Sequence, residues 1–187
     1  MSTGAVTRLV LLRHAKSAWP DVADHERPLG PRGLRDAPEA GRWLRDAGCL
    51  PGLVICSTAR RTRETWALAA GQLGIEVPVR FDERVYAAEP EDLLEVVSEV
   101  PAEVRTLLLV GHNPGLEDLA VNLAQEPGDA VDAEVMGRLS EKFPTSAIAV
   151  LACPGSWQEL TPGSARLTAF AVPRGAAPRL RNSPEGH

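Results

Sequence analysis

The chain has 187 residues, a formal net charge of −5 and 44% hydrophobic residues, which together fit one globular domain. The net negative charge gives the chain no positive electrostatic field that would attract nucleic acid. No apolar run approaches the roughly 20 residues that cross a membrane. The first residues lack the apolar core of a secretory signal, so we expect a cytoplasmic protein. Cys49, Cys56 and Cys153 are widely spaced, and we expect reduced core thiols rather than a disulfide frame or a zinc site.

Apolar segments alternate with segments of helical periodicity along the chain. In chain order, the expected elements are a strand at 6–12, a helix from 33 to about 48, a strand at 52–57, a helix at 59–73, a strand at 77–81, a helix from 90 to about 100, a strand at 105–112, a helix from 114 to about 123, and strands at 145–153 and 165–172. The alternation predicts an α/β three-layer sandwich, in which helices cover both faces of a mostly parallel sheet. We expect one domain over residues 1–172 and a flexible tail at 173–187, which is rich in Pro, Gly and Arg.

Charged side chains follow three of the predicted strands. Arg13 and His14 come after the first strand, Arg60 and Arg61 come after the second, and His112 ends the strand at 105–112. In a parallel sheet the carboxyl ends of the strands meet at one edge, and ligands bind there. The sequence therefore predicts that these guanidinium and imidazole groups converge on one site.

Two guanidinium groups and two imidazoles make a pocket for a tetrahedral dianion, because arginine donates paired hydrogen bonds to phosphate oxygens and stays charged. A neutral imidazole can attack phosphorus and form a phosphohistidine. Nearby arginines disfavour the imidazolium form of His14, which favours His14 as the nucleophile. His112 is better suited to hydrogen-bond the phosphoryl oxygens in the transition state. The alternative is that each histidine is a satisfied polar residue at the edge of the core.

Four blocks of the chain resemble the histidine phosphatase superfamily. "LVLLRHAKS" is similar to its Arg-His signature, "CSTARRTRETW" to its second block, and "LLLVGHNPGL" to the block of the second histidine. "FPTSAIAVL" resembles the late strand of the SixA-type phosphohistidine phosphatases, which are short members. The resemblance covers roughly residues 8–172 and implies a phosphoglycerate mutase-like fold without cofactor or metal. It also implies that His14 is the nucleophile and that the phosphoryl group is held by Arg13, Arg61 and His112.

Four further residues are candidates for the site, two of them weaker than the others. The run from Glu83 to Tyr86 resembles the segment that carries the general acid in phosphoglycerate mutases, so Glu83 is a candidate proton donor; the alternative is a surface carboxylate before a helix. Asp21 and Asp82 are weaker candidates for that role. Ser17 is a candidate phosphate contact, with a structural role in the loop as the alternative.

Larger relatives carry a helical insertion before the second histidine, and this chain has none. We therefore expect a shallow, open site that takes a phosphorylated protein or a small phosphoester as its partner. The resemblance implies hydrolysis of a phosphohistidine or a phosphomonoester through a covalent phosphohistidine. The alternatives are a phosphotransferase of the phosphoglycerate mutase type, a non-catalytic phosphate- or phosphoprotein-binding module, and metal-dependent hydrolysis. The physiological substrate and the oligomeric state are left open.

Overall fold

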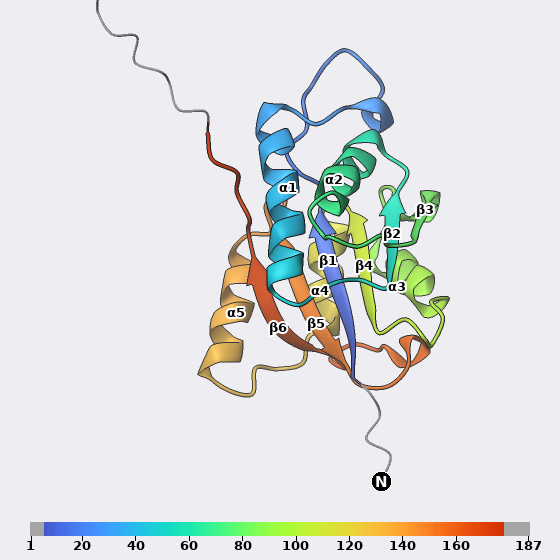
Figure 1. Cartoon of the computed structure of the whole chain (residues 1–187). Coiled ribbons are helices and arrows are strands. Elements are labelled where there is room, and N and C mark those ends of the chain that lie inside the picture. Colours follow the sequence, from blue (N-terminus) through green and yellow to red (C-terminus); the bar gives the residue numbers. More distant parts are fainter. Residues whose placement is uncertain (1–5, 178–187) are drawn as a thin grey trace, which may run out of the picture.

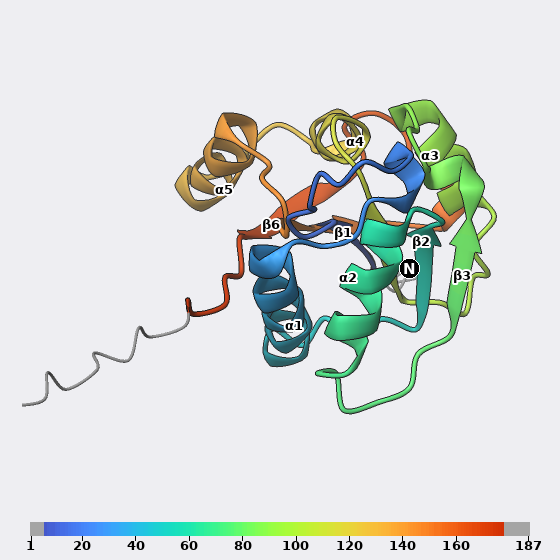
Figure 2. The same cartoon turned by 90° about the horizontal axis from the view of Figure 1, so that it is seen from above.

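The computed structural model describes residues 6–177 and has three layers built on a six-stranded sheet (Figure 1). Helices α1 and α2 cover one face, and α3, α4 and α5 cover the other (Figure 2). The strands are β1 (Thr7–Arg13), β2 (Leu53–Ser57), β3 (Val79–Asp82), β4 (Thr106–Gly111), β5 (Ile148–Cys153) and β6 (Arg166–Ala171). The helices are α1 (Pro31–Asp46), α2 (Arg60–Ala70), α3 (Pro90–Ser98), α4 (Gly115–Leu123) and α5 (Ala130–Glu141). The predicted α/β three-layer sandwich is confirmed.

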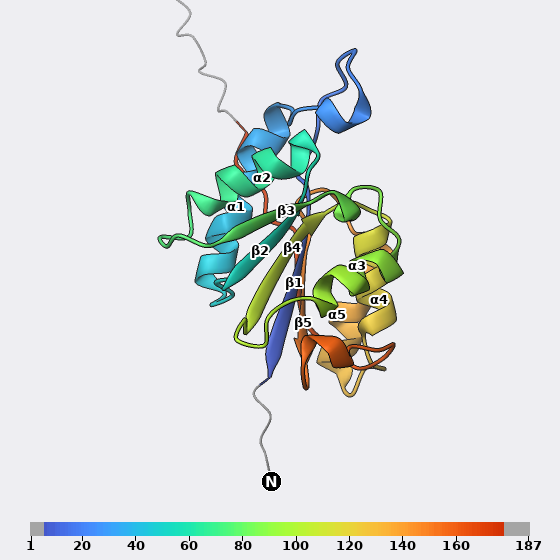
Figure 3. The same cartoon turned by 90° about the vertical axis from the view of Figure 1, so that its right-hand side faces the viewer.

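The sheet has the strand order β3-β2-β4-β1-β5-β6. The first four strands of this order pair in parallel, whereas β5 pairs antiparallel with both β1 and β6. Strand β1 lies in the middle, and its apolar residues 9–12 are fully buried. In the register Arg13 stands opposite Gly111, and Cys56 opposite Val110. The ends of β1, β2 and β4 therefore lie side by side, and Figure 3 shows these strands running toward one edge.

Helix α5 was not predicted, because its apolar face is narrow. Leu139 is its one fully buried residue, while Val135 and Met136 pack against the core only in part. Val131 in the first turn is 67% exposed. A helix that buries so few positions leaves little periodic signal in its sequence. In α1, by contrast, the apolar side chain of Leu34 belongs to the periodic pattern that predicts the helix, yet it is 51% exposed.

The segment after β6 differs from the expectation of a flexible tail from Pro173 onward. Arg174 Nη1 donates hydrogen bonds to Asp36 Oδ2 at 3.0 Å and to the Thr145 carbonyl at 2.7 Å. The Gly175 amide donates to Asp36 Oδ1 at 2.9 Å. Because Asp36 is a buried residue of α1, the start of the predicted tail is fastened to that helix, while residues 178–187 lie outside the described part.

Two expectations from composition concern the whole fold. The three cysteines are buried and carry free thiols. Between residues 6 and 177, no helix combines the length and the apolar character that a membrane crossing requires.

Candidate active site

Four of the predicted site residues lie together at the edge of the sheet where β1, β2 and β4 end. Arg13 is the last residue of β1, and His14 follows it; His112 follows β4. Arg61 lies in the first turn of α2, the helix that comes after β2. The His14 amide donates a 3.0 Å hydrogen bond to the Gly111 carbonyl, which ties the two strand ends together. As a result the imidazole rings of His14 and His112 have centroids only 5.4 Å apart.

The surroundings of His14 set both its tautomer and its charge. Its Nδ1 lies 2.7 Å from the Ala15 carbonyl oxygen, which can only accept, so we place the ring proton on Nδ1. Nε2 then carries a free lone pair. Burial lowers the pKa of His14 to about 3, and the charges of Arg61 and Arg13 act in the same direction. The imidazole is therefore neutral at physiological pH, as a nucleophile must be.

His112 is also held as a neutral imidazole. Its Nε2 lies 2.7 Å from Ser57 Oγ, at the end of β2. Burial lowers the pKa of His112 to about 3, with smaller effects in the same direction from His14 and Arg61. Its other ring nitrogen, Nδ1, is buried and has no hydrogen-bond partner within residues 6–177.

The two arginines of the site also contain unpartnered nitrogens. Arg13 Nη1 donates to the Phe143 carbonyl at 2.9 Å, but its Nε is buried without a partner in the described chain, and so is Arg61 Nε. A buried donor without a partner costs about 1–3 kcal/mol. Two such donors beside two neutral imidazoles indicate a site for an anion that accepts several hydrogen bonds.

Asp24 is a site residue that sequence reasoning missed. It lies in the short 3₁₀ helix η1 (Asp24–Glu26), in the loop between β1 and α1. Its Oδ2 accepts hydrogen bonds from Tyr86 Oη at 2.6 Å and from Arg61 Nη2 at 3.1 Å. The bonds from Tyr86, Arg27 and Arg61 hold the pKa of Asp24 far below its usual range. Asp24 is therefore ionised, and its role in the geometry is to orient Arg61.

Arg27 was also missed, although it lies at the same site. It is buried, and its charge contributes to the lowered pKa of His14. Its Nε donates to Asp24 Oδ1 at 3.0 Å, and its Nη1 donates to Ser17 Oγ at 2.7 Å. Its guanidinium carbon lies 3.6 Å from the ring centroid of Trp19, which is 76% exposed. Ser17 thus receives a hydrogen bond from Arg27, which fits the structural role that was its alternative.

Glu83 opens the 3₁₀ helix η2 (Glu83–Val85), directly after β3. It is exposed, in contrast to the buried His14. Three residues later, the ring of Tyr86 stands edge-on to His112, with centroids 5.6 Å apart. Helix η2 therefore borders the site. The weaker candidate Asp82 forms an ion pair with Arg84, with 2.7 Å between Asp82 Oδ2 and Arg84 Nη2. Asp21 is exposed in the loop after β1.

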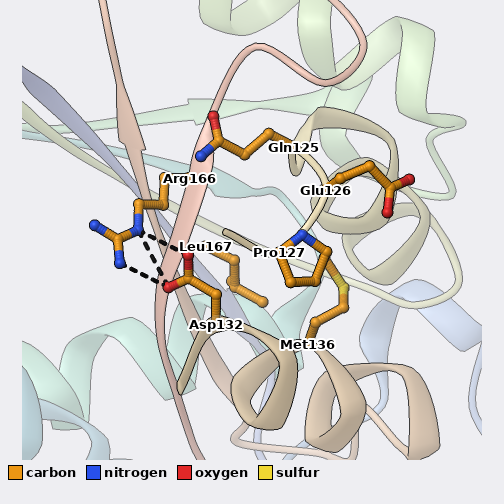
Figure 4. A pocket seen from close by; sticks show the side chains of 7 residues that line it. All are labelled: Gln125, Glu126, Pro127, Asp132, Met136, Arg166 and Leu167. Carbon is orange, nitrogen blue, oxygen red and sulfur yellow. Dashed lines mark hydrogen bonds and ion pairs between the residues drawn. The ribbon is translucent and has the colours of Figure 1, made fainter. Parts of the chain in front are cut away.

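A small pocket lies near the opposite end of the sheet, between α5 and β6 (Figure 4). It is lined by Asp132, Met136 and Arg166 among others, and Asp132 Oδ1 lies 2.8 Å from Arg166 Nη2. Its volume of about 10 Å³ has room for no more than one water molecule. It is too small for a substrate.

Comparison with known proteins identifies the family of the chain. Residues 9–106 match the model of the histidine phosphatase superfamily, branch 1. An uncharacterized protein of Mycobacterium tuberculosis is 50% identical over 164 residues, which cover 87% of this chain and 100% of that protein. A solved structure from Nakamurella multipartitia, assigned as the phosphohistidine phosphatase SixA, is 35% identical, covers 90% of this chain and 96% of its own, and has a TM-score of 0.77.

The structure of the protein histidine phosphatase SixA complexed with tungstate shares the fold, with a TM-score of 0.72 at 19% identity over 89% of this chain and 97% of that one. Both SixA structures align over nearly the whole length of this chain. Taken with the match to the family model, these findings establish that the chain belongs to the histidine phosphatase superfamily.

Proposed function

We propose that this protein is a metal-independent phosphatase that hydrolyses a phosphohistidine protein or a small phosphomonoester through a phosphohistidine on His14. The observation that carries the proposal is the state of His14, which is neutral, protonated on Nδ1 and close to the charges of Arg13, Arg61 and Arg27. Its Nε2 lone pair attacks phosphorus while the bond from phosphorus to the leaving atom breaks. Arg13, Arg61 and His112 hold the phosphoryl oxygens. Water then cleaves the new N–P bond, which releases phosphate and restores the imidazole.

The ionisation of Asp24 bears on the class of substrate. Asp24 is the carboxylate that contacts Arg61 and Tyr86, and its lowered pKa leaves it no proton to donate at neutral pH. An alkoxide leaving group needs protonation as it departs. A phosphoramidate is protonated more easily at its leaving nitrogen. An alkyl phosphoester therefore needs a proton donor other than Asp24, whereas a phosphohistidine side chain does not, which favours the phosphohistidine. The three free thiols suit a reducing compartment such as the cytoplasm.

Phosphate release from a substrate panel, with a chelator present, tests the proposal. The panel contains a phosphohistidine protein, a phosphoramidate, an aryl phosphate and a phosphoglycerate. We expect kcat/KM to be at least about tenfold higher for the phosphohistidine protein than for the phosphoglycerate, and no release by the variant His14→Ala. Release that requires a metal ion, or that survives in His14→Ala, would contradict the proposal. A mutase would instead require a bisphosphate primer, and a binding module would bind phosphate without turnover.

Glu83 is proposed as the proton donor for ester substrates, from its position at the border of the site. The change Glu83→Gln is expected to lower kcat for an alkyl phosphate by about 100-fold. Hydrolysis of a phosphoramidate should change less than about twofold, since its nitrogen needs no such donor. The measurement is a plot of log kcat against leaving-group pKa for both proteins. Glu76→Gln, at another exposed carboxylate, is the control, and equal slowing of all substrates by Glu83→Gln, or none, would remove Glu83 from the mechanism.

A further inference from the structure

A cleft of about 340 Å³ opens beside Arg13. It is lined by Arg13, Lys16, Arg32, Lys142, Pro144, Thr145 and Arg174. Every lining residue other than Pro144 and Thr145 is basic, and Lys16 and Lys142 are both of the lysines in the chain. In a protein with a net charge of −5, such a gathering of positive charge at one place is a local feature and does not follow from the composition.

Acidic residues compensate only part of this charge. Asp36 lies 3.0 Å from Arg174 Nη1 and 3.4 Å from Arg32 Nε, and it is itself buried. The charge of Glu117 acts on Arg13. Lys16 and Lys142 are exposed and form no ion pair with any residue of the described chain. The cleft therefore keeps an excess of positive charge, which attracts an anion.

The cleft is built from segments that are distant in sequence and fixed to one another. Asp36 fastens Arg174 and Gly175 to α1. The first turn of α1 packs tightly on the Lys16 backbone, since a Cβ at Gly33 would lie 3.0 Å from the Lys16 carbonyl carbon and closer still to its oxygen. These contacts hold the basic residues in one arrangement before any ligand binds, which lowers the entropic cost of binding.

Arg13 connects the cleft to the proposed phosphoryl site. It lines the cleft, and it directly precedes His14 at the end of β1. Its Nη1 donates to the Phe143 carbonyl, and the next two residues, Pro144 and Thr145, form part of the cleft wall. A molecule that presents a phosphoryl group to His14 can therefore extend past Arg13 into the cleft.

We propose that this basic cleft binds a second anionic group, phosphate or carboxylate, of the same substrate whose phosphoryl group is transferred to His14. The inference rests on the proposed function, and it narrows the substrate to one with two anionic groups. The second group can belong to a small molecule or to an acidic side chain near a phosphohistidine on a protein. Lys142 and Arg32 supply direct contacts, because arginine and lysine are the usual partners of phosphate and carboxylate oxygens.

The test uses calorimetric binding of non-hydrolysable α,ω-alkylene bisphosphonates, each compared with the monoalkyl phosphonate of the same carbon number. For at least one spacer length, we expect the bisphosphonate to bind the wild-type protein about tenfold or more tightly. The double variant Arg32→Gln/Lys142→Gln should lose this gain and keep the monophosphonate affinity within about twofold. No gain at any spacer length, or a gain that the double variant retains, would overturn the inference.

A matched control removes two charges elsewhere through Arg45→Gln/Arg166→Gln. Arg45 lies in the last turn of α1 and Arg166 begins β6, at the other end of the sheet from Arg13. This control should keep the tighter binding of the bisphosphonate. Melting temperatures of both double variants confirm that they fold. Absence of monophosphonate binding to the wild type would count against the proposed phosphoryl site instead. In that case, bisphosphonate binding that is lost in Arg32→Gln/Lys142→Gln would still support the cleft as an anion site, and binding that the double variant retains would contradict it.

Two peptides with a central phosphohistidine distinguish the source of the second group. One carries flanking glutamates and the other carries glutamines at the same positions. If the group comes from a protein, the wild type hydrolyses the acidic peptide with a kcat/KM about tenfold higher, and Arg32→Gln/Lys142→Gln removes this preference. If it comes from a small molecule, the bisphosphonate gain is seen and the two peptides are hydrolysed alike.

Discussion

Brief incubation of the wild-type protein with a labelled phosphoryl donor is expected to leave acid-labile, alkali-stable label on the chain, and His14→Ala is expected to leave none. The reason is geometric, because the Ala15 carbonyl holds the proton on Nδ1 of His14 and leaves Nε2 to attack. Removal of a covalent nucleophile from an otherwise intact site costs at least about 1,000-fold in kcat. Rapid quenching followed by acid and alkali treatment of the protein gives the measurement.

Two other histidines serve as controls for this experiment. His25→Ala should label like the wild type, because the ring nitrogens of His25 contact Glu26 and Thr58 and its ring packs against Tyr86, so it forms no hydrogen bond with either imidazole of the pair within residues 6–177. His112→Ala should still become labelled, but about 100-fold more slowly, since it loses a hydrogen bond that stabilises transferred charge. Label that persists on His14→Ala would show that another residue is the nucleophile, and label on no protein would exclude the covalent route.

The positions of Arg13, His14 and His112 could be predicted because each residue lies at the carboxyl end of a strand whose apolar run is plain in the sequence. Residues 9–12 and 107–110 are continuous apolar runs and are fully buried. A buried parallel strand fixes where its last residue lies relative to its neighbours. The strand register then brings together groups that are about 100 residues apart in sequence. Local sequence patterns alone could not have placed these groups beside one another.

Asp24 and Arg27 could not be predicted in the same way. They lie in the irregular segment between β1 and α1, where no periodicity relates sequence to direction. Their roles depend on Tyr86, which reaches Asp24 from the other side of the site. The run "DHERPL" contained three charged residues and a histidine, but nothing in the pattern indicated which side chains turn inward. Such loops carry site residues whose positions only the folded chain determines.

The sequence likewise did not predict whether β5 and β6 pair in parallel or antiparallel with their neighbours. The apolar run 145–153 predicts a strand, and the structure has β5 there, but an apolar run is the same for parallel and antiparallel pairing. The chain reaches β5 through α5, which returns it to the carboxyl edge of β1, so β5 runs back beside β1 in the antiparallel sense. Because the narrow apolar face of α5 gives little periodic signal, the helix that sets the direction of β5 could not be predicted.

The packing of α1 against α2 gives the largest effect that we expect on stability. Gly41 of α1 faces the backbone of Ala69 in α2, and a Cβ at this position would lie 2.8 Å from the Ala69 Cα and closer still to its carbonyl oxygen. Backbone atoms cannot move aside as a flexible side chain can, so the helices must separate. Since α2 carries Arg61 in its first turn, the same contact also supports the position of a phosphate-binding residue.

Gly41→Ala is therefore expected to lower the free energy of unfolding by about 2–3 kcal/mol, in the upper part of the range for overpacked cores. Gly137→Ala is the matched control, because Gly137 lies inside α5 with no atom within 4 Å of its Cβ position. There the same change should raise the free energy of unfolding by about 0.5–1 kcal/mol, since alanine loses less backbone entropy in a helix. Urea denaturation at equal m-values measures both. If Gly41→Ala instead raised the free energy of unfolding as Gly137→Ala does, the close approach of α1 and α2 at Gly41 would be wrong, because helix propensity alone would then account for both.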